Sequence, residues 1–522
     1  MSRFVRPSSY RHVYGQPVKK EKMYDNIKIS ASAWDTNLLS ASAKYLAVNY
    51  QSSGGGAFLV TPLDVTGKLP DVFPLCRSHT APVLDTAWSP FDDSLIASAS
   101  EDSRVAITRI DDAILRDALS GDSKEVHDLV PTVTLSGHGR KVGHVVWHPT
   151  ADGLLTSASN DVKLWDVTAQ KAVYTSAAHG DMVQSMSWDY CGTTIATTCK
   201  DKKLRLLDPR AGVDAVSVAD SHAGVKGSRV QWMGSLDRIV TTGFSRTSER
   251  QVYVWDSTNI QSGPLKTITI DQSSGTLMPF WVDGNNVLFL AGKGDGNIRY
   301  YEWQGEELHY LNEYSSPQPQ RGMCLLPPRA RSAHTNEIAR AFKAVGSTIE
   351  PVSFYVPRKS EAFQNDIFPP CPSDKPALTA QEWLDGKTAE PNKVDMETLE
   401  QQQGAPPKTH TPATPIRAAT PAQPAAPTPV ASTPVSRSAA ATPPPAAAQE
   451  PKAQEPAVPD AAAAAAVISN GAASDNEAVS KLESSLAESR QRTAQLEHDL
   501  QERDAEIKSL RQKLEKIRAA LD

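Results

Sequence analysis

The chain has few cysteines, no long apolar run and little net charge. Its 522 residues include five cysteines, an odd and scattered number without a Cys-x-x-Cys pair, which argues against a disulfide framework and favours reduced thiols. The longest purely apolar run, 461–468, is too short to cross a bilayer, and the polar N-terminus has no signal-peptide core. A net charge of -6 gives no bulk attraction to nucleic acid. We therefore expect a soluble cytoplasmic protein without a membrane span or a nucleic-acid partner.

Aromatic residues are also missing, but only from one end of the chain. All ten tryptophans lie before residue 400, whereas the sequence beyond it is rich in Pro, Ala and Thr and then in charged residues. A segment without aromatic residues and poor in branched apolar ones cannot bury a core. The composition therefore predicts a folded N-terminal part followed by a disordered Pro/Ala/Thr-rich linker at 404–473.

One spacing recurs in the folded part. A His is followed by Val four residues on and by Trp nine residues on at His79, His138 and His179, and more loosely at His222. Each mark precedes a short strand, a Ser/Thr-rich strand and an Asp, with a period of about 40 residues that is typical of WD repeats. Seven strand-rich units can be marked between residues 29 and 356. We therefore predict an all-β, seven-bladed WD-repeat β-propeller over residues 1–359.

The repeat also predicts contacts inside the propeller. His79 and Asp102 are expected to form a buried hydrogen-bonded pair with a Ser and often a Trp, because polar groups inside a β core need partners. The short third unit predicts a tight hairpin at Asn160 and Asp161. We expect segment 4–14 to supply the missing outer strand of the seventh blade and so to close the ring.

Nothing in the repeats predicts catalysis. Ser, His and Asp recur at the repeat period, which favours a structural network, because a single active site would not be copied in every blade. Segment 292–296 lies between two β runs with no helix after it, which favours a turn over a phosphate loop. His138, His144 and His148 lack Cys or carboxylate neighbours at ligand spacing. We predict that the protein is not an enzyme and has no catalytic residue, metal or cofactor.

Two further segments follow the propeller. Residues 360–403 hold enough apolar side chains to pack on it as an extension, with a short helix capped by Thr379. Residues 474–522 carry apolar residues at heptad positions a and d, which predicts a coiled coil that forms a parallel dimer or trimer. A helix with one apolar stripe needs such a partner. The predicted oligomerisation positions are Val479, Leu482, Leu486, Leu496, Leu500, Ile507, Leu510, Leu514, Ile517 and Leu521.

Several stretches resemble the coronin family, over about residues 4–390. They are SSYRHVYGQPVK at 8–19, SGGGAF at 53–58, CKDKK at 199–203, TGFSR with SERQ at 242–251, PQRGM at 319–323 and VPRKS at 356–360. The linker and terminal coil match in kind and order, so the whole resembles a short coronin of fungal type. The resemblance implies a protein that binds and crosslinks actin filaments, acts on the actin-related-protein branching complex and on cofilin-driven turnover, and localises to cortical actin structures.

The resemblance further implies that basic residues on the propeller touch the filament. One of them is Lys28, which stands where many relatives have Arg. Independently, filamentous actin is acidic and attracts a basic rim. The candidate actin-binding residues are Lys28, Arg11, Lys19, Lys20, Lys22, Lys202, Lys203 and Arg205. The alternative is a propeller-plus-coil scaffold for non-actin partners, linked to trafficking or to microtubules, and the N-terminal signature argues against it.

Overall fold

The computed structural model describes residues 6–53, 55–120, 126–359 and 362–403. The predicted linker at 404–473 and the predicted coiled coil at 474–522 lie outside these residues. The same holds for every predicted oligomerisation position. The architecture below therefore concerns the propeller and the extension that follows it.

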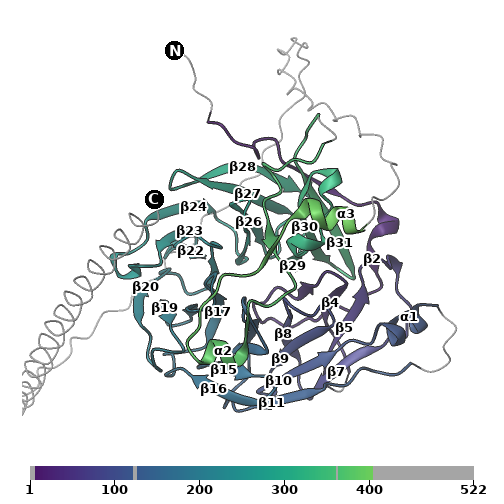
Figure 1. Cartoon of the computed structure of the whole chain (residues 1–522), viewed down its shortest axis with the longest axis horizontal. Helices are drawn as coiled ribbons and strands as arrows, with labels where there is room; N and C mark the ends of the chain where they lie inside the picture. The colour runs from purple at the N-terminus through teal and green to yellow at the C-terminus, as the bar shows by residue number, and fades with distance from the viewer. Residues whose placement is uncertain (1–5, 54, 121–125, 360–361, 404–522) are drawn as a thin grey trace, which may run out of the picture. The chain divides into compact units, whose positions relative to one another are not determined.

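Within the described residues, seven antiparallel sheets stand around one axis (Figure 1). The prediction of an all-β, seven-bladed WD-repeat propeller is thereby confirmed. From the axis outward, the first four blades are β3 (Leu39–Ala41), β4 (Tyr45–Tyr50), β5 (Gly56–Pro62) and β7 (Leu75–His79); β8 (Val83–Trp88), β9 (Leu95–Ser100), β10 (Arg104–Arg109) and β11 (Val133–Ser136); β12 (His144–Trp147), β14 (Leu154–Ala158), β15 (Val162–Asp166) and β16 (Lys171–Thr175); and β17 (Val183–Trp188), β18 (Ile195–Cys199), β19 (Lys203–Leu207) and β20 (Ser217–Asp220). The other three are β21 (Arg229–Trp232), β22 (Arg238–Phe244), β23 (Arg250–Asp256) and β24 (Lys266–Asp271); β25 (Leu277–Val282), β26 (Val287–Gly292), β27 (Asn297–Gln304) and β28 (Glu307–Ser315); and β29 (Gly322–Leu325), β30 (Glu337–Val345) and β31 (Thr348–Tyr355), completed by β1 (Tyr14–Pro17) and β2 (Tyr24–Asp25).

Blades and sequence repeats are offset by one strand. His79, the mark of the second repeat, ends β7, which pairs with β5 in the first blade. The outermost strand of the first blade therefore comes from the start of the next repeat. The offset links neighbouring blades through the chain itself.

The middle strands are buried on both faces because each blade packs between two others. In β9, residues 96–100 are all buried, and the small side chains of Ala97, Ser98 and Ala99 let the sheets converge. Tryptophans then join blade to blade through hydrogen bonds. Trp88 Nε1 donates to the Ser40 carbonyl at 3.1 Å, and Trp147 Nε1 donates to the Ala87 carbonyl at 2.8 Å. A large apolar ring with one donor suits such a seam.

The N-terminal segment closes the ring, but with different residues from those predicted. β1 pairs antiparallel with β31, with Tyr14 opposite Tyr355 and Pro17 opposite Val352. The expected strand at 4–14 is wrong in position. Within it, Tyr10 and Val13 are buried against the sixth and seventh blades instead, and Val13 N–H donates to the Tyr10 carbonyl in a turn. Burying these two apolar side chains sets where the closing strand begins.

Helix α1 (Asp112–Ser120) was not predicted. It lies between β10 and β11 and buries Leu115 and Ala118 on the first blade. Asp112 accepts a hydrogen bond from Tyr45 at 2.9 Å, and Arg116 bridges to Asp112 and Asp64. Four 3₁₀ turns, at Lys20–Lys22, Ile260–Ser262, Pro328–Ala330 and Ala333–Thr335, and the short strands β6 (Gly67–Lys68) and β13 (Ala151–Asp152) complete this part.

The extension after β31 crosses the ring to the third blade (Figure 1). It contains β32 (Cys371–Pro372), β33 (Leu378–Thr379), α2 (Ala380–Leu384), β34 (Lys393–Val394) and α3 (Met396–Gln403). The predicted cap is confirmed: the Thr379 hydroxyl accepts from Glu382 N–H, and the Glu382 carboxylate accepts from Thr379 N–H. β33 pairs with β13, so the extension joins the propeller through its backbone. No helix among the described residues combines the length and the apolar character needed to cross a bilayer.

Candidate functional site

The alternating strand directions give the propeller two distinct faces. We call upper face the one that carries the connections into each innermost strand and those between the second and third strands of a blade. We call lower face the one that carries the remaining connections. The upper-face connections include 26–38, 80–82, 101–103, 137–143, 159–161, 176–182, 200–202, 221–228, 245–249, 272–276, 293–296 and 316–321.

The N-terminal segment and the extension lie on the lower face. Asn285, between β25 and β26, donates to the Ile367 carbonyl at 2.7 Å and to the Tyr10 hydroxyl at 3.0 Å. The N–H groups of Ala377 and Leu378 both donate to the Thr150 carbonyl, between β12 and β14. The N-terminal segment and the extension thus cover lower-face connections of the third and sixth blades.

A segment ahead of the first blade fills the upper end of the central channel. Trp34 Nε1 donates to the Gly143 carbonyl at 3.1 Å, and the ammonium of Lys141 lies 4.4 Å from the Trp34 ring centre. Thr36 donates to the Leu84 carbonyl, and Arg321 donates to the Ser30 carbonyl. Residues 30–37, the channel segment, therefore bond to the second, third and seventh blades.

Asp35 ties the channel segment to two more blades. Its carboxylate lies 3.0 Å from both Arg229 Nη2 and Lys293 Nζ, and it accepts from the Thr276 hydroxyl at 2.9 Å. Burial alone would raise the pKa of Asp35, but Arg229 and Lys293 outweigh it and hold that pKa well below its usual range. Burial lowers the pKa of Lys293, and the nearby Asp35 opposes that shift. Asp35 is therefore a fixed anion that holds two cations at the axis.

The eight basic residues predicted to contact actin do not form one surface. Lys28 and Lys202 are exposed on the upper face, and Lys203, which follows Lys202 in the sequence, pairs with Asp220 at 3.2 Å. Arg205 is largely buried in a bidentate pair with Asp201. The other four lie elsewhere: Lys19, Lys20 and Lys22 between β1 and β2 at the edge of the seventh blade, and Arg11 on the N-terminal segment.

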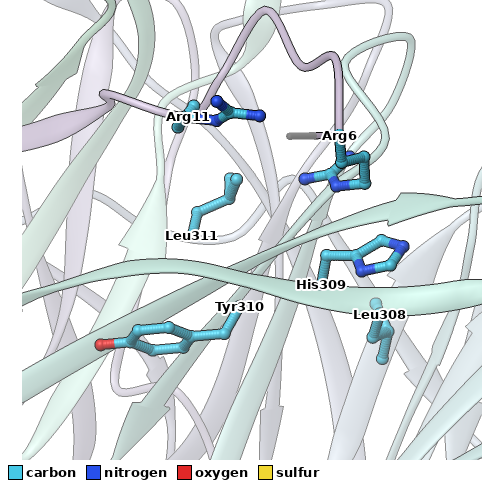
Figure 2. Close-up of a pocket in the computed structure, with 6 residues that line it drawn as sticks. All are labelled: Arg6, Arg11, Leu308, His309, Tyr310 and Leu311. Atoms are coloured by element: carbon cyan, nitrogen blue, oxygen red, sulfur yellow. The ribbon is translucent and has the colours of Figure 1, made fainter. Parts of the chain in front are cut away.

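Arg11 lines a shallow pocket against the sixth blade, whereas Lys202 belongs to the fourth. Figure 2 shows Arg6 and Arg11 on the N-terminal segment, facing residues 308–311 of β28. Arg6 forms an ion pair with Glu302 and a hydrogen bond with Gln304. These contacts neutralise part of the positive charge and fasten the segment to the sixth blade.

Five further cations on the upper face escaped the sequence analysis. They are exposed and stand in its connections or at the strand ends beside them: Arg104, Arg140, Lys200, Lys226 and Arg246. Among the described residues, Arg140 and Arg246 have no ion-pair partner. The position of each of these residues relative to the His and the strand hydroxyl of its repeat would have placed all five on one face.

The predicted polar network is complete in two repeats and incomplete in two. His138 lies 2.8 Å from Asp161 through Nδ1 and 2.6 Å from the Ser157 hydroxyl through Nε2, and Trp165 donates to that hydroxyl. His79 makes the matching bonds to Asp102 and Ser98. Within the part of the chain that the structure describes, the rings of His179 and His222 each bond to one threonine, through Nε2. These bonds join strands to one another and position no side chain for chemistry.

No group of three or more His, Cys, Asp or Glu side chains in the described ranges could hold a metal ion. The five cysteines are free thiols, four of them buried. Burial raises the pKa of Cys199 to about 11, which keeps its thiol protonated and unreactive.

Several family models match the chain. A domain of unknown function (DUF1899) matches residues 3–68, the WD domain, G-beta repeat matches 72–107, 129–166 and 170–208, and a type of WD40 repeat matches 349–391. A solved relative, the WD40 domain of Toxoplasma gondii coronin, superposes with a TM-score of 0.69 at 29% identity, covering 74% of this chain and 97% of that one.

Curated relatives match over most of the chain. Coronin-like protein crn1 of Schizosaccharomyces pombe is 51% identical over 406 residues, which are 77% of this chain and 66% of that protein. The Coronin-like protein of Saccharomyces cerevisiae is 50% identical over 403 residues, or 76% and 61%. The match therefore spans less than two thirds of either relative. Coronin-A of Dictyostelium discoideum is 44% identical over 398 residues, which are 76% of this chain and 87% of that protein. These identities and the seven-bladed ring show that the chain belongs to the coronin family.

Proposed function

We propose that this chain binds actin filaments through the upper face of its propeller. Six exposed cations of the upper face carry the proposal, because none of them has an ion-pair partner among the described residues, while the N-terminal segment and the extension cover part of the lower face. An acidic filament surface is attracted to such a face and oriented by it. Membership of the coronin family supports the same partner.

Seven exposed side chains form the proposed contact. Lys28 stands two residues before the channel segment, and its carbonyl accepts from Gln51 N–H at 2.8 Å, which fixes its backbone. A lysine here supplies a point charge without the bidentate geometry of an arginine. The set is Lys28, Arg104, Arg140, Lys200, Lys202, Lys226 and Arg246, of which only Lys200 has an acidic partner among the described residues, Asp181 at 3.7 Å.

The other predicted contacts have smaller roles in this proposal. Asp201 neutralises Arg205, and Asp220 neutralises Lys203. Arg11 lies beside β28, away from the upper-face connections. Because paired charges are already partly compensated, their removal changes the attraction less than removal of unpaired ones.

The protein acts in this proposal as a cytoplasmic scaffold on cortical actin and not as an enzyme. Self-association through the predicted coil at 474–522 would place two or three propellers on one stalk, which raises apparent affinity through effective concentration and allows filaments to be crosslinked. Action on the actin-related-protein branching complex and on cofilin-driven turnover belongs to the same proposal.

Cosedimentation of the full chain with actin filaments tests the proposal directly. Binding is expected, and its affinity is expected to fall as the ionic strength rises, because salt screens contacts between exposed charges. A protein that stays in the supernatant at low salt, or whose affinity does not depend on salt, would contradict it.

A further inference from the structure

One repeat lacks the carboxylate that its neighbours contain. Asp102, Asp161 and Asp201 each stand four residues after the strand hydroxyl of their repeat, at Ser98, Ser157 and Thr197. In the next repeat the hydroxyl belongs to Thr241, and the fourth residue after it is Ser245. His222, which bonds to Thr241, therefore has no Asp of its own repeat to face.

The ring of His222 holds a nitrogen for which the described residues offer no hydrogen-bond partner. Trp255 Nε1 donates to the Thr241 hydroxyl at 2.9 Å, so the hydroxyl proton is free to point at His222 Nε2, 3.0 Å away. The remaining proton of the neutral ring then sits on Nδ1. His222 is only 3% exposed, and its Nδ1 has no hydrogen-bond partner among the described residues.

The hydroxyls of Ser221 and Ser228 are also buried without a hydrogen-bond partner among the described residues. His222, Ser221 and Ser228 line one small cavity between the fourth and fifth blades, with a volume of about 10 Å³. Buried polar atoms without partners are rare in native proteins and call for an explanation. A cavity of this size admits one oxygen atom or one water.

Lysines surround the mouth of the cavity. Lys200 lies 3.7 Å from Asp181, and Lys203 lies 3.2 Å from Asp220, so both have acidic partners. Lys202 and Lys226 instead donate to the carbonyls of Ala223 and Ser274. No carboxylate of the described residues pairs with either of these two lysines.

We propose that this cavity binds one carboxylate oxygen of an acidic side chain presented by the partner. The donors are His222 Nδ1 and the hydroxyls of Ser221 and Ser228, and Lys202 and Lys226 supply the charge. The arrangement reproduces, between two proteins, the His–Asp contact that His138 and Asp161 make within the chain. The inference rests on the proposed function, because it assigns the upper face a socket for the acidic filament surface.

A carboxylate fits the site better than a phosphate. The cavity takes a single oxygen atom, and the planar His–carboxylate contact already occurs in two repeats. A phosphate would keep three of its oxygen atoms outside, among the lysines. Acetate and inorganic phosphate are therefore the probes that separate the two chemistries.

The first experiment observes His222 itself. The full chain, labelled with ¹⁵N-histidine, is titrated with sodium acetate, with inorganic phosphate and with sodium chloride at matched ionic strength. The His222 signal is identified by its ring contact with Tyr253, 3.9 Å between centroids. A saturable shift with acetate, at least fivefold weaker in Lys226→Gln and restored in Lys226→Arg, is expected. A shift with phosphate but not with acetate overturns the proposal. So does a shift with acetate no larger than that with chloride, because the cavity would then hold water.

The second experiment separates this inference from the proposed function. Lys226→Gln is expected to bind actin filaments about fivefold more weakly than the wild type, whereas Lys266→Gln, an exposed lysine on β24 away from the cavity, should bind as the wild type does. If the wild type pellets with filaments and Lys226→Gln binds equally well, the socket is wrong and the proposed function stands. If the wild type does not pellet, the proposed function fails, and the acetate titration still decides whether the cavity takes a carboxylate.

Discussion

Trp383 and His148 donate to the same backbone oxygen. Trp383 Nε1 and His148 Nε2 each lie 2.8 Å from the Gly192 carbonyl oxygen, and the two rings meet edge to face at 5.0 Å. His148 belongs to the third blade, Gly192 to the fourth and Trp383 to the extension. One carbonyl thus fastens the extension to the seam between two blades on the lower face.

Gly192 should tolerate no side chain. Its φ is +71°, and a Cβ there would lie 2.1 Å from His148 Cε1. We expect Gly192→Ala to lower the free energy of unfolding by about 2–4 kcal/mol, from backbone strain and overpacking, and to speed proteolysis of residues 362–403. Urea unfolding and limited proteolysis measure both effects. Gly139→Ala, where an added Cβ meets nothing within 4 Å, is the matched control; equal stability of the two variants would contradict the account.

Three buried histidines should make the protein sensitive to mild acid. Burial lowers the pKa of His148, His179 and His222 to about 4. The unfolded chain binds these protons near pH 6.5, so their contribution to stability is complete above that pH and is lost as the pH falls toward 4. We expect the free energy of unfolding to drop by about 2 kcal/mol per histidine between pH 7 and 4.5.

Urea unfolding at several pH values measures this drop. Carboxylates with lowered pKa, such as Asp161 with a value of about 2, lose their contribution only below about pH 4, so the interval from 6.5 to 4.5 reports the histidines. A variant with His222→Gln should lose less stability over that interval than the wild type. A flat profile in the wild type is the result that would refute the assignment.

Asp35 should be needed for the channel segment. Removing its charge by Asp35→Asn leaves Arg229 and Lys293 facing each other without an anion, and Arg229 is 7% exposed. We expect a loss of about 2 kcal/mol in the free energy of unfolding. The same change at Asp220, which is 91% exposed in its pair with Lys203, should cost less than about 0.5 kcal/mol. Calorimetry measures the transition temperatures of both variants. Equal temperatures would contradict the role of Asp35 in holding the channel segment.

The local parts of this fold could be predicted from sequence. The His–Val–Trp spacing predicted the blade type, and the strand-rich units between residues 29 and 356 predicted the count of seven. Asn160 and Asp161 form the tight connection between β14 and β15, and Thr379 caps α2. Each depends on residues close together in the chain. The His–Asp pairs also followed, because the repeat fixes their separation at 23 residues.

Long-range choices could not be predicted. The closing strand begins at Tyr14 because Tyr10 and Val13 are buried against the sixth and seventh blades. Their partners lie almost 300 residues further along the chain. Trp34 and Asp35 contact residues of several blades. The sequence around these two residues contains no pattern that predicts such contacts. Arg205 looked free in sequence because its pairing with Asp201 depends on side-chain direction.

The predicted coil should matter for crosslinking and not for single-site binding. Ending the chain after residue 473 removes the heptad segment and leaves the propeller intact. We expect filament binding to persist with lower apparent affinity, while bundling is lost, because bundling requires two propellers on one stalk. Low-speed and high-speed sedimentation with actin distinguish the two activities, and undiminished bundling by the shortened chain would refute this part.

Charge reversal on the two faces tests the central claim most directly. The variant Lys28→Glu with Lys202→Glu alters the upper face, and Lys171→Glu with Lys375→Glu, both exposed at the lower-face side, is the control of equal charge. In filament cosedimentation at low salt, the account predicts about tenfold weaker binding and a shallower salt dependence for the upper-face variant only. Equal affinities for the two variants, or a larger loss in the lower-face variant, would contradict it.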